Sequence, residues 1–220
     1  MNPNMKAIIF DVYGTLFDVY SITSKCEELY PGNGEKMSTL WRKKQLEYAF
    51  LCQLMDKYRS FLSITRSSLK YALNELQLLY NEESEKILLE AYKQLSPFPE
   101  VESVLQQLQN KKKLVVFSNG SHDMLEPLVK TSTLSPYIDD IISIDDVKQY
   151  KPTPASYLHA LRTLGYEKEE ILFVSSNGWD IIGATNFGFK TAWVNRKNLP
   201  LDELDTLPHF MFRDLSGMLK

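Results

Sequence analysis

Cysteine is scarce in this chain: only Cys26 and Cys52 occur among its 220 residues. The two positions show no metal-ligand spacing, so the sequence gives no sign of a cysteine-based metal site or a disulfide framework. Free thiols are typical of a reducing compartment. We therefore expect a cytoplasmic protein.

Long apolar runs are also missing. The apolar stretch that begins at Ala7 is interrupted at Asp11, and no later stretch approaches the length that a membrane span requires. Neither a signal peptide nor a transmembrane segment is expected, and no membrane partner. Met5 is a second methionine near the N-terminus, so translation from Met1 or from Met5 stays open.

The sequence has no excess of positive charge. Its net charge is −3, and the only basic run, at residues 111–113, is interpreted as a solvated turn before a strand. A nucleic-acid-binding surface would require a basic stripe, so we expect no nucleic-acid partner.

Five short, mostly β-branched apolar runs predict buried strands. Because these runs are continuous rather than alternating, they indicate a parallel sheet covered on both faces. Helical patterns lie between the later runs, and this alternation predicts an α/β fold with a doubly wound, Rossmann-like core. The predicted strands are residues 7–10, 114–117, 141–144, 171–174 and 191–194.

The region from about residue 17 to residue 96 contains no convincing strand. Three helices are predicted there, at residues 35–58, 64–78 and 82–95, with a return linker at residues 97–99. An all-helical block between the first and second strands indicates an inserted cap domain. We therefore predict a discontinuous core of residues 1–16 and 97–220, and a cap of residues 17–96.

Polar clusters follow four of the predicted strands. Each cluster has a structural explanation of its own, such as capping a helix. In a parallel sheet, however, all the strand ends lie along one edge, where ligands bind. Convergence on one crevice is therefore expected. The clusters are residues 11–15, residues 118–121, Lys151 with Pro152, and residues 175–180.

These motifs resemble those of the haloacid dehalogenase superfamily and, within it, the (S)-2-haloacid dehalogenases. The resemblance runs from Ala7 to about Arg196. The stretches that carry it are Phe10-Asp11-Val12-Tyr13-Gly14-Thr15-Leu16-Phe17-Asp18, Trp41-Arg42-x-Lys44-Gln45-Leu46-Glu47-Tyr48, Ser118-Asn119-Gly120-Ser121, Tyr150-Lys151-Pro152 and Val174-Ser175-Ser176-Asn177-x-Trp179-Asp180.

Two positions depart from the phosphatases of this superfamily. Phosphatases carry a second aspartate two residues after the nucleophile, where this chain has Tyr13, and a Gly-Asp pair where it has Ser175-Ser176. Those carboxylates serve as a general acid and as ligands for Mg²⁺, which prefers hard oxygen donors. An alkyl halide needs neither an acid nor a metal, so no metal and no cofactor are expected.

The resemblance implies covalent catalysis by Asp11. The carboxylate attacks C2 of the haloacid, and water then hydrolyses the aspartyl ester. Asp180 with Asn177 is expected to activate the water, and Lys151 to stabilise charge on Asp11. The hydroxyls of Thr15 and Ser175 would orient the nucleophile and Lys151 by hydrogen bonds. The implied catalytic set is Asp11, Thr15, Lys151, Ser175, Asn177 and Asp180.

The resemblance also implies a substrate pocket. Ser118 and backbone N–H groups of the first loop would hold the substrate carboxylate, while Arg42 and Asn119 would bind the halide. Without the resemblance, Arg42 would be interpreted as a surface arginine. For Leu46 and Phe61, a place in the hydrophobic core explains the residue nearly as well as a place in the pocket. The implied substrate-binding set is Val12, Tyr13, Arg42, Leu46, Phe61, Ser118, Asn119, Tyr157 and Trp179.

The predicted function is hydrolysis of short (S)-2-haloalkanoic acids to (R)-2-hydroxy acids with inversion. The expected partners are this small-molecule substrate and water. A preference for fluoroacetate and, less favoured, a Mg²⁺-dependent phosphatase are the alternatives. A binding protein on a retired enzyme fold is a third class, although every expected catalytic position is occupied. A homodimer is left open.

Overall fold

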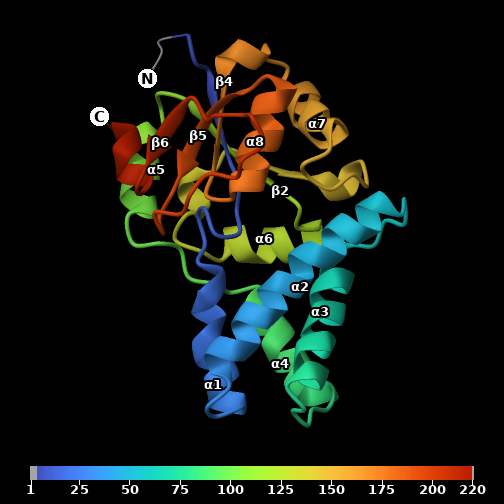
Figure 1. Cartoon of the computed structure of the whole chain (residues 1–220). Coiled ribbons are helices and arrows are strands. Elements are labelled where there is room, and N and C mark those ends of the chain that lie inside the picture. The colour runs from blue at the N-terminus through green and yellow to red at the C-terminus, as the bar shows by residue number, and fades with distance from the viewer. Residues whose placement is uncertain (1–3, 220) are drawn as a thin grey trace.

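Six parallel strands form one sheet in the computed structural model, which describes residues 4–219 (Figure 1). Their order is β3-β2-β1-β4-β5-β6, so β1 lies between β2 and β4 in the centre. Five of the predicted strands are confirmed to within one residue at each end. The strands are β1 (Ala7–Phe10), β2 (Lys113–Ser118), β3 (Asp140–Ser143), β4 (Ile171–Ser175), β5 (Lys190–Val194) and β6 (Phe210–Phe212).

Helices cover both faces of the sheet, which confirms the predicted α/β class. The chain adds strands on one side of β1 and then crosses to the other side, and right-handed crossovers place α5 and α6 on one face and α7 and α8 on the opposite face. These helices are α5 (Val101–Leu108), α6 (His122–Lys130), α7 (Pro154–Leu164) and α8 (Gly178–Phe187).

Four further helices pack together below the carboxyl edge of the sheet (Figure 1). Three correspond to predicted helices, while α1 is additional: it is only seven residues long and buries Cys26 alone. The division into a core and a cap stays a prediction. The helices are α1 (Thr23–Leu29), α2 (Gly34–Leu54), α3 (Phe61–Glu75) and α4 (Glu82–Tyr92).

Two chain segments connect this bundle to the sheet, and they are paired with each other. Asp18 N–H donates to the Ser96 carbonyl at 2.8 Å, and Phe98 N–H donates to the Leu16 carbonyl at 3.0 Å. The outgoing and returning chains therefore leave the sheet side by side.

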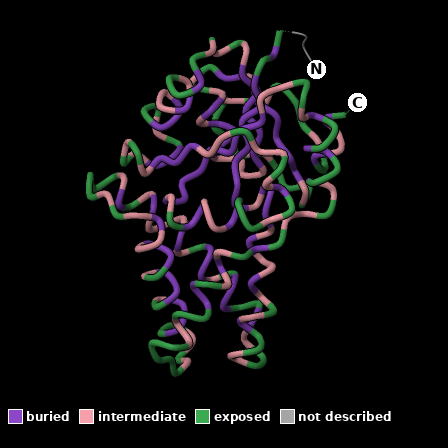
Figure 2. The backbone as a smooth tube through the Cα atoms, turned by 180° about the vertical axis from the view of Figure 1, so that it is seen from behind, coloured by how far each residue is buried: buried purple, intermediate pink, exposed green. Residues whose placement is uncertain are grey.

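The buried apolar residues form one cluster that extends from the sheet along the inside of the bundle (Figure 2). In the bundle, Trp41 Nε1–H donates to the Thr65 carbonyl at 2.9 Å and fixes α2 against α3. Met55, directly after α2, is 56% exposed and takes no part in this packing.

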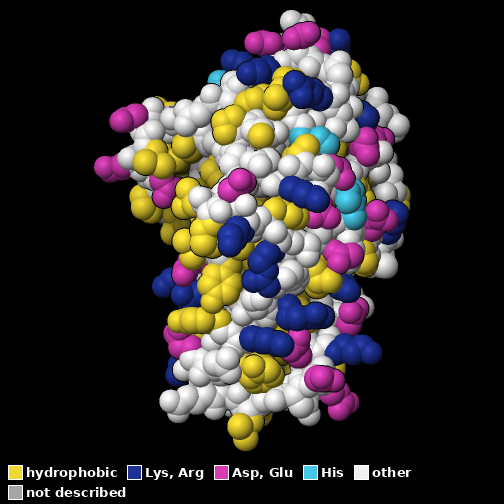
Figure 3. Space-filling view, turned by 90° about the vertical axis from the view of Figure 1, so that its right-hand side faces the viewer, with side chains coloured by type: hydrophobic (Ala, Val, Ile, Leu, Met, Phe, Trp, Pro, Cys, Tyr) yellow, Lys and Arg dark blue, Asp and Glu magenta, His cyan; other side chains and the backbone are white. Residues whose placement is uncertain are grey.

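Surface charge is mixed on the face shown in Figure 3, where lysine and arginine side chains are interspersed with aspartate and glutamate. Within residues 4–219, no helix combines the length and the apolar character needed to cross a bilayer.

The central strand generates a stability prediction. Ile9→Ala is expected to lower the free energy of unfolding by about 3 kcal/mol, because Ile9 is fully buried in β1 and its truncation leaves a cavity. Urea denaturation measures the change. The matched control is Ile87→Ala on α4, where the side chain is 38% exposed and the loss should stay below about 1 kcal/mol. Equal losses in the two variants would contradict this assignment of the core.

Candidate active site

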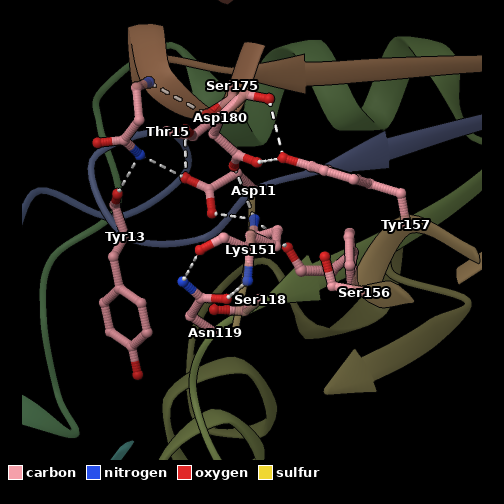
Figure 4. A network of polar contacts seen from close by, with 12 residues as sticks. Asp11, Tyr13, Thr15, Ser118, Asn119, Lys151, Ser156, Tyr157, Ser175 and Asp180 are labelled. Atoms are coloured by element: carbon pink, nitrogen blue, oxygen red, sulfur yellow. Dashed lines mark hydrogen bonds and ion pairs between the residues drawn. The ribbon is translucent and has the colours of Figure 1, made fainter. Parts of the chain in front are cut away.

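The four predicted polar clusters meet at the carboxyl edge of the sheet (Figure 4). Asp11 directly follows β1, Asn119 directly follows β2, and Asp180 lies in the first turn of α8 after β4. Lys151 arrives from the segment after β3. The parallel strands therefore bring together side chains that are more than a hundred residues apart in the chain, such as Asp11 and Lys151.

Asp11 is held by side chains on both of its carboxylate oxygens. Oδ1 accepts from Lys151 Nζ at 2.8 Å, while Oδ2 accepts from Thr15 Oγ1 at 2.9 Å and from Asn177 Nδ2 at 2.9 Å. Gly14, with a φ of 90°, adopts the left-handed conformation that favours glycine and turns the chain back behind the carboxylate. Asp11 is thus 4% exposed and fixed in orientation.

Lys151 is fully buried, and its ammonium group binds three acceptors. Nζ donates to Asp11 Oδ1 at 2.8 Å, to Asp180 Oδ2 at 2.7 Å and to the Phe117 carbonyl at 3.1 Å. Burial lowers the pKa of Lys151, but the two carboxylates outweigh it and raise the pKa above the ordinary value. The lysine is therefore cationic at neutral pH.

Asp180 completes this buried charge cluster. Its Oδ1 atom accepts from the Tyr157 hydroxyl at 2.8 Å, and its Oδ2 atom accepts from Lys151. Burial, followed by the negative charge of Asp11, raises the pKa of Asp180 from 3.8 to about 6, although Lys151 and Tyr157 oppose the shift. A carboxylate with such a pKa is ionised at pH 7 and is a competent proton acceptor.

Asn119 and Ser175 hold the backbone around this cluster. Asn119 accepts the Lys151 N–H at 2.8 Å through Oδ1 and donates to the Lys151 carbonyl at 3.3 Å. Ser175 Oγ accepts the Asn177 N–H at 3.1 Å, so it supports Asn177 rather than Lys151, the partner we expected. Ser118 is fully buried, and its Oγ atom accepts the Gly120 N–H at 3.0 Å.

Arg42 reaches the same region from α2. Its side chain is buried, with one guanidinium nitrogen donating to Gln45 Oε1 at 2.7 Å and the other to the Tyr13 carbonyl at 3.4 Å. The first nitrogen thus makes a short hydrogen bond to a neutral acceptor, and the second makes a long one. Within residues 4–219, Arg42 forms no salt bridge with a carboxylate. A buried cation paired only with neutral groups is suited to an anionic ligand.

Aromatic side chains from the bundle and from the sheet side pack against one another near this cluster. Tyr13 packs against Phe61 with ring centroids 5.4 Å apart, and Trp179 meets Phe50 of α2 edge to face at 5.2 Å. Tyr13 and Phe61 are almost fully buried, Val12 is fully buried and Leu46 is half-buried. These contacts place Tyr13, Phe61 and Trp179, three of the predicted wall residues, where the bundle meets the sheet.

Several residues at the site escaped the sequence analysis. Gln45 binds Arg42 and also accepts from the Tyr92 hydroxyl at 2.9 Å. Phe117 and Phe173 place their rings 4.9 and 5.3 Å from Lys151 Nζ. Gln45 lies within the motif that carried the resemblance, three positions after Arg42, and this helical spacing is the one available signal.

Comparisons with known proteins identify the family of this chain. Residues 5–188 match the family model of haloacid dehalogenase-like hydrolases. An (S)-2-haloacid dehalogenase of Pseudomonas putida is 42% identical, over 98% of this chain and 95% of its own length. A haloacetate dehalogenase H-2 of a Moraxella species is also 42% identical, over 94% of this chain and 92% of its own.

A solved structure extends the similarity to three dimensions. The L-2-haloacid dehalogenase of Xanthobacter autotrophicus with chloropropionic acid covalently bound has a TM-score of 0.91 and 38% identity, covering 97% of this chain and 96% of that one. The fold and the buried carboxylate site thus define a hydrolase. This chain belongs to the haloacid dehalogenase-like hydrolase family. The predicted enzyme class, a hydrolase acting on carbon–halide bonds, is confirmed.

The buried cluster predicts a pH-dependent loss of stability. Lys151→Met is expected to lower the free energy of unfolding by about 4 kcal/mol at pH 8, because it leaves Asp11 and Asp180 as buried, unpaired like charges. Loss of the Lys151 charge, which opposes the shift, raises the folded pKa of Asp180 further, so the folded variant binds a proton at higher pH than its unfolded chain does. The loss should therefore be smaller at pH 5 than at pH 8.

Urea denaturation at both pH values checks this expectation. Wild-type Lys151, with its raised pKa, stays charged at pH 5 and at pH 8. Wild-type Asp180 also gains a proton between these values, so the variant is compared with the wild type at the same pH, and the further rise in the pKa of Asp180 in the variant reduces the loss at pH 5. Lys130→Met is the matched control, since its side chain is 64% exposed. An equal loss at the two pH values would contradict the electrostatic explanation.

Proposed function

We propose that this protein hydrolyses short (S)-2-haloalkanoic acids to (R)-2-hydroxy acids through an ester on Asp11. The observation that carries the proposal is the buried Asp11–Lys151–Asp180 cluster, in which a cation bridges a nucleophile and a proton acceptor. The relative from Pseudomonas putida and the covalent chloropropionic acid in the Xanthobacter structure support the same chemistry.

The first step is displacement of halide by Asp11 Oδ1. Oδ2 already accepts from Thr15 and Asn177, whereas Oδ1 accepts from Lys151 alone and keeps a lone pair free. That lone pair forms the bond to C2 as the carbon–halogen bond breaks and its electron pair leaves with the halide. In-line attack inverts the configuration at C2.

The second step is hydrolysis of the aspartyl ester. With Oδ1 bonded to substrate, Oδ2 becomes the ester carbonyl oxygen, and the Thr15 and Asn177 donors stabilise the negative charge that water attack places on it. Asp180 accepts the proton from water, and the bond between the carbonyl carbon and Oδ1 then breaks. Oδ1 leaves on C2 as the hydroxyl oxygen of the product and takes that proton back from Asp180, while the water oxygen remains on the restored Asp11 carboxylate. Because the carbonyl carbon is attacked rather than C2, the inverted configuration persists in the hydroxy acid.

Charge balance explains why one lysine serves both steps. Lys151 faces two carboxylates before reaction and one after Asp11 becomes an ester, so the cluster changes from net negative to neutral. Once Asp11 is neutral, its charge no longer raises the pKa of Asp180. Asp180 therefore stays ionised until it takes the proton from water.

The remaining polar groups are assigned to the two ends of the substrate. Ser118 and the N–H groups of the loop after Asp11 hold the substrate carboxylate. Arg42, which is weakly hydrated and has no carboxylate partner among residues 4–219, receives the halide together with the Asn119 amide.

We assign helices α1–α4 to a cap that closes over this crevice. Phe61 and Leu46 from the bundle, together with Tyr13 and Trp179 from the sheet side, form the wall around the alkyl group. The contacts between Tyr13 and Phe61, and between Trp179 and Phe50, support a wall built from both parts of the chain.

Haloacetates are a second candidate substrate class. The Moraxella relative named as a haloacetate dehalogenase is as similar to this chain as the Pseudomonas putida relative. A haloacetate carries no alkyl group at C2 and would use the same nucleophile. Fluoroacetate requires cleavage of the strongest carbon–halogen bond and is the demanding member of this class.

A Mg²⁺-dependent phosphatase is less favoured by the residues at the site. Tyr13 stands where a phosphatase carries its acid, and burial raises the pKa of its phenol well above the ordinary value, so it is a poor proton donor. Ser176 occupies the position of a metal-binding carboxylate. Within residues 4–219, no three histidine, cysteine or acidic side chains are grouped so that they could hold a metal ion.

Chloride release from (S)- and (R)-2-chloropropanoate tests the proposed function. Only the S form should react, it should give (R)-lactate, and EDTA should have no effect. Chloroacetate and fluoroacetate form the second arm. After a single turnover in H₂¹⁸O, the label should be on Asp11 rather than in the product, because water attacks the ester carbonyl.

The isosteric variant Asp11→Asn is expected to be inactive, while Asp202→Asn, an exposed aspartate, should match the wild type. Release from neither enantiomer, or EDTA-sensitive hydrolysis of a phosphate ester instead, would show that Asp11 serves another chemistry.

The pKa of Asp180 predicts the pH dependence of the second step. Burial and the charge of Asp11 raise it to about 6 in the free enzyme, and alkylation of Asp11 removes part of that cause. Ester hydrolysis should therefore slow as pH falls through a value at or below about 6, where Asp180 becomes protonated. Rapid quenching and mass spectrometry of the Asp11 adduct measure this rate.

Asp180→Asn provides the control for this assignment. It should slow ester hydrolysis by about 100-fold or more and let the Asp11 adduct accumulate, since the first step does not need the proton acceptor. An acid limb above pH 7, or an Asp180→Asn variant that forms no adduct, would contradict the role given to Asp180.

A further inference from the structure

A second set of contacts joins the helical bundle to the segment that carries Lys151. Gln53, near the end of α2, accepts the Tyr150 N–H at 2.7 Å through Oε1 and donates to Gln149 Oε1 at 2.9 Å through Nε2. The Tyr150 hydroxyl in turn donates to the Arg59 carbonyl at 2.7 Å. One bundle side chain therefore engages both residues that immediately precede Lys151.

Aromatic packing encloses these contacts. The Tyr58 and Tyr150 rings have centroids 5.5 Å apart, and Phe61 lies 6.3 Å from Tyr150 on the side that faces the substrate wall. The Tyr58 hydroxyl also donates to Asp145, at the start of the same segment. Tyr150 is fully buried, so losing the Gln53 acceptor would leave a backbone N–H without water to replace it.

The backbone of Lys151 is consequently held from two sides. Asn119 binds its N–H and its carbonyl from the sheet, and Gln53 holds the preceding residue, Tyr150, from the bundle. We propose that Gln53 is a positioning residue that uses the docking of α2 to place the Lys151 ammonium between the two carboxylates. This inference rests on the proposed function, in which Lys151 stabilises the charge of both steps.

The position of Gln53 on α2 supports this coupling. Gln53 follows Arg42 by about three turns of helix, so the two side chains project from nearly the same face. Arg42 contacts the loop after β1 through the Tyr13 carbonyl, while Gln53 contacts the segment after β3. Docking of α2 therefore positions Arg42, the proposed halide ligand, and Gln53, the support for Lys151, at the same time.

Gln53→Ala tests the inference. We expect kcat on the accepted haloacid to fall about tenfold or more while KM changes less than about threefold, because a displaced ammonium weakens charge stabilisation rather than substrate capture. Deuterium uptake of the peptide that contains Tyr150 should increase, since its N–H loses an acceptor. Gln53→Glu retains an acceptor oxygen and should restore most of both properties. Gln106→Ala, the same change on the exposed face of α5, is the matched control.

Tyr150→Phe is a second variant in case Gln53→Ala fails to fold. It removes only the hydroxyl contact with Arg59 and keeps the buried ring, and it should lower kcat about threefold, with KM unchanged. Thermal unfolding establishes that each variant is folded.

The outcomes separate this inference from the proposed function. A wild-type enzyme without activity on any haloacid refutes the proposed function. Faster deuterium uptake at Tyr150 in Gln53→Ala would still confirm the hydrogen bond between Gln53 and the Tyr150 N–H. An active wild type with a Gln53→Ala variant as fast as Gln106→Ala overturns the positioning role. So does a rise in KM at constant kcat, or a failure of Gln53→Glu to restore the rate.

Discussion

A buried ammonium group shared by two carboxylates is the interaction on which this structure depends. Removing three charges from water is costly, and the cost is met only when each charged group has partners of good geometry. Lys151 satisfies this condition with one contact to Asp11, one to Asp180 and one to the Phe117 carbonyl. The three partners come from β1, α8 and β2, so the cluster can form only when the parallel sheet is assembled.

The surrounding hydrogen bonds follow from the same constraint. Each carboxylate oxygen that does not contact Lys151 needs another hydrogen-bond donor. Thr15 and Asn177 donate to Asp11 Oδ2, and Tyr157 donates to Asp180 Oδ1. The result is an asymmetric carboxylate: among residues 4–219, Asp11 Oδ2 accepts from two side chains and Oδ1 from Lys151 alone. The requirement to stabilise buried charge thus leaves Oδ1 with fewer partners, and Oδ1 is the oxygen to which the proposed function assigns the attack.

Sequence patterns predicted the sheet because its inner strands are continuous apolar runs with polar residues immediately after them. The edge strand β6 was missed, since its three residues are partly exposed and show no buried pattern. The convergence of the polar side chains was predicted from motif resemblance and from the rule that parallel strand ends meet at one edge. Ser175 received the wrong partner, because its bond with the Asn177 N–H depends on the local turn before α8 rather than on any motif.

Contacts between the bundle and the sheet were the least predictable part. Nothing in the sequence pairs Phe50 with Trp179 or Gln53 with Tyr150, since these contacts depend on the angle at which α2 crosses the strand ends. That helix spans Gly34–Leu54 and contains no proline and no glycine after its first residue, so it lacks the usual causes of a kink. A straight helix cannot move one contact without moving the others. The bundle therefore contacts the loops after β1, β3 and β4 through this one helix, so the positions of Tyr13, Tyr150 and Trp179 depend together on the position of α2.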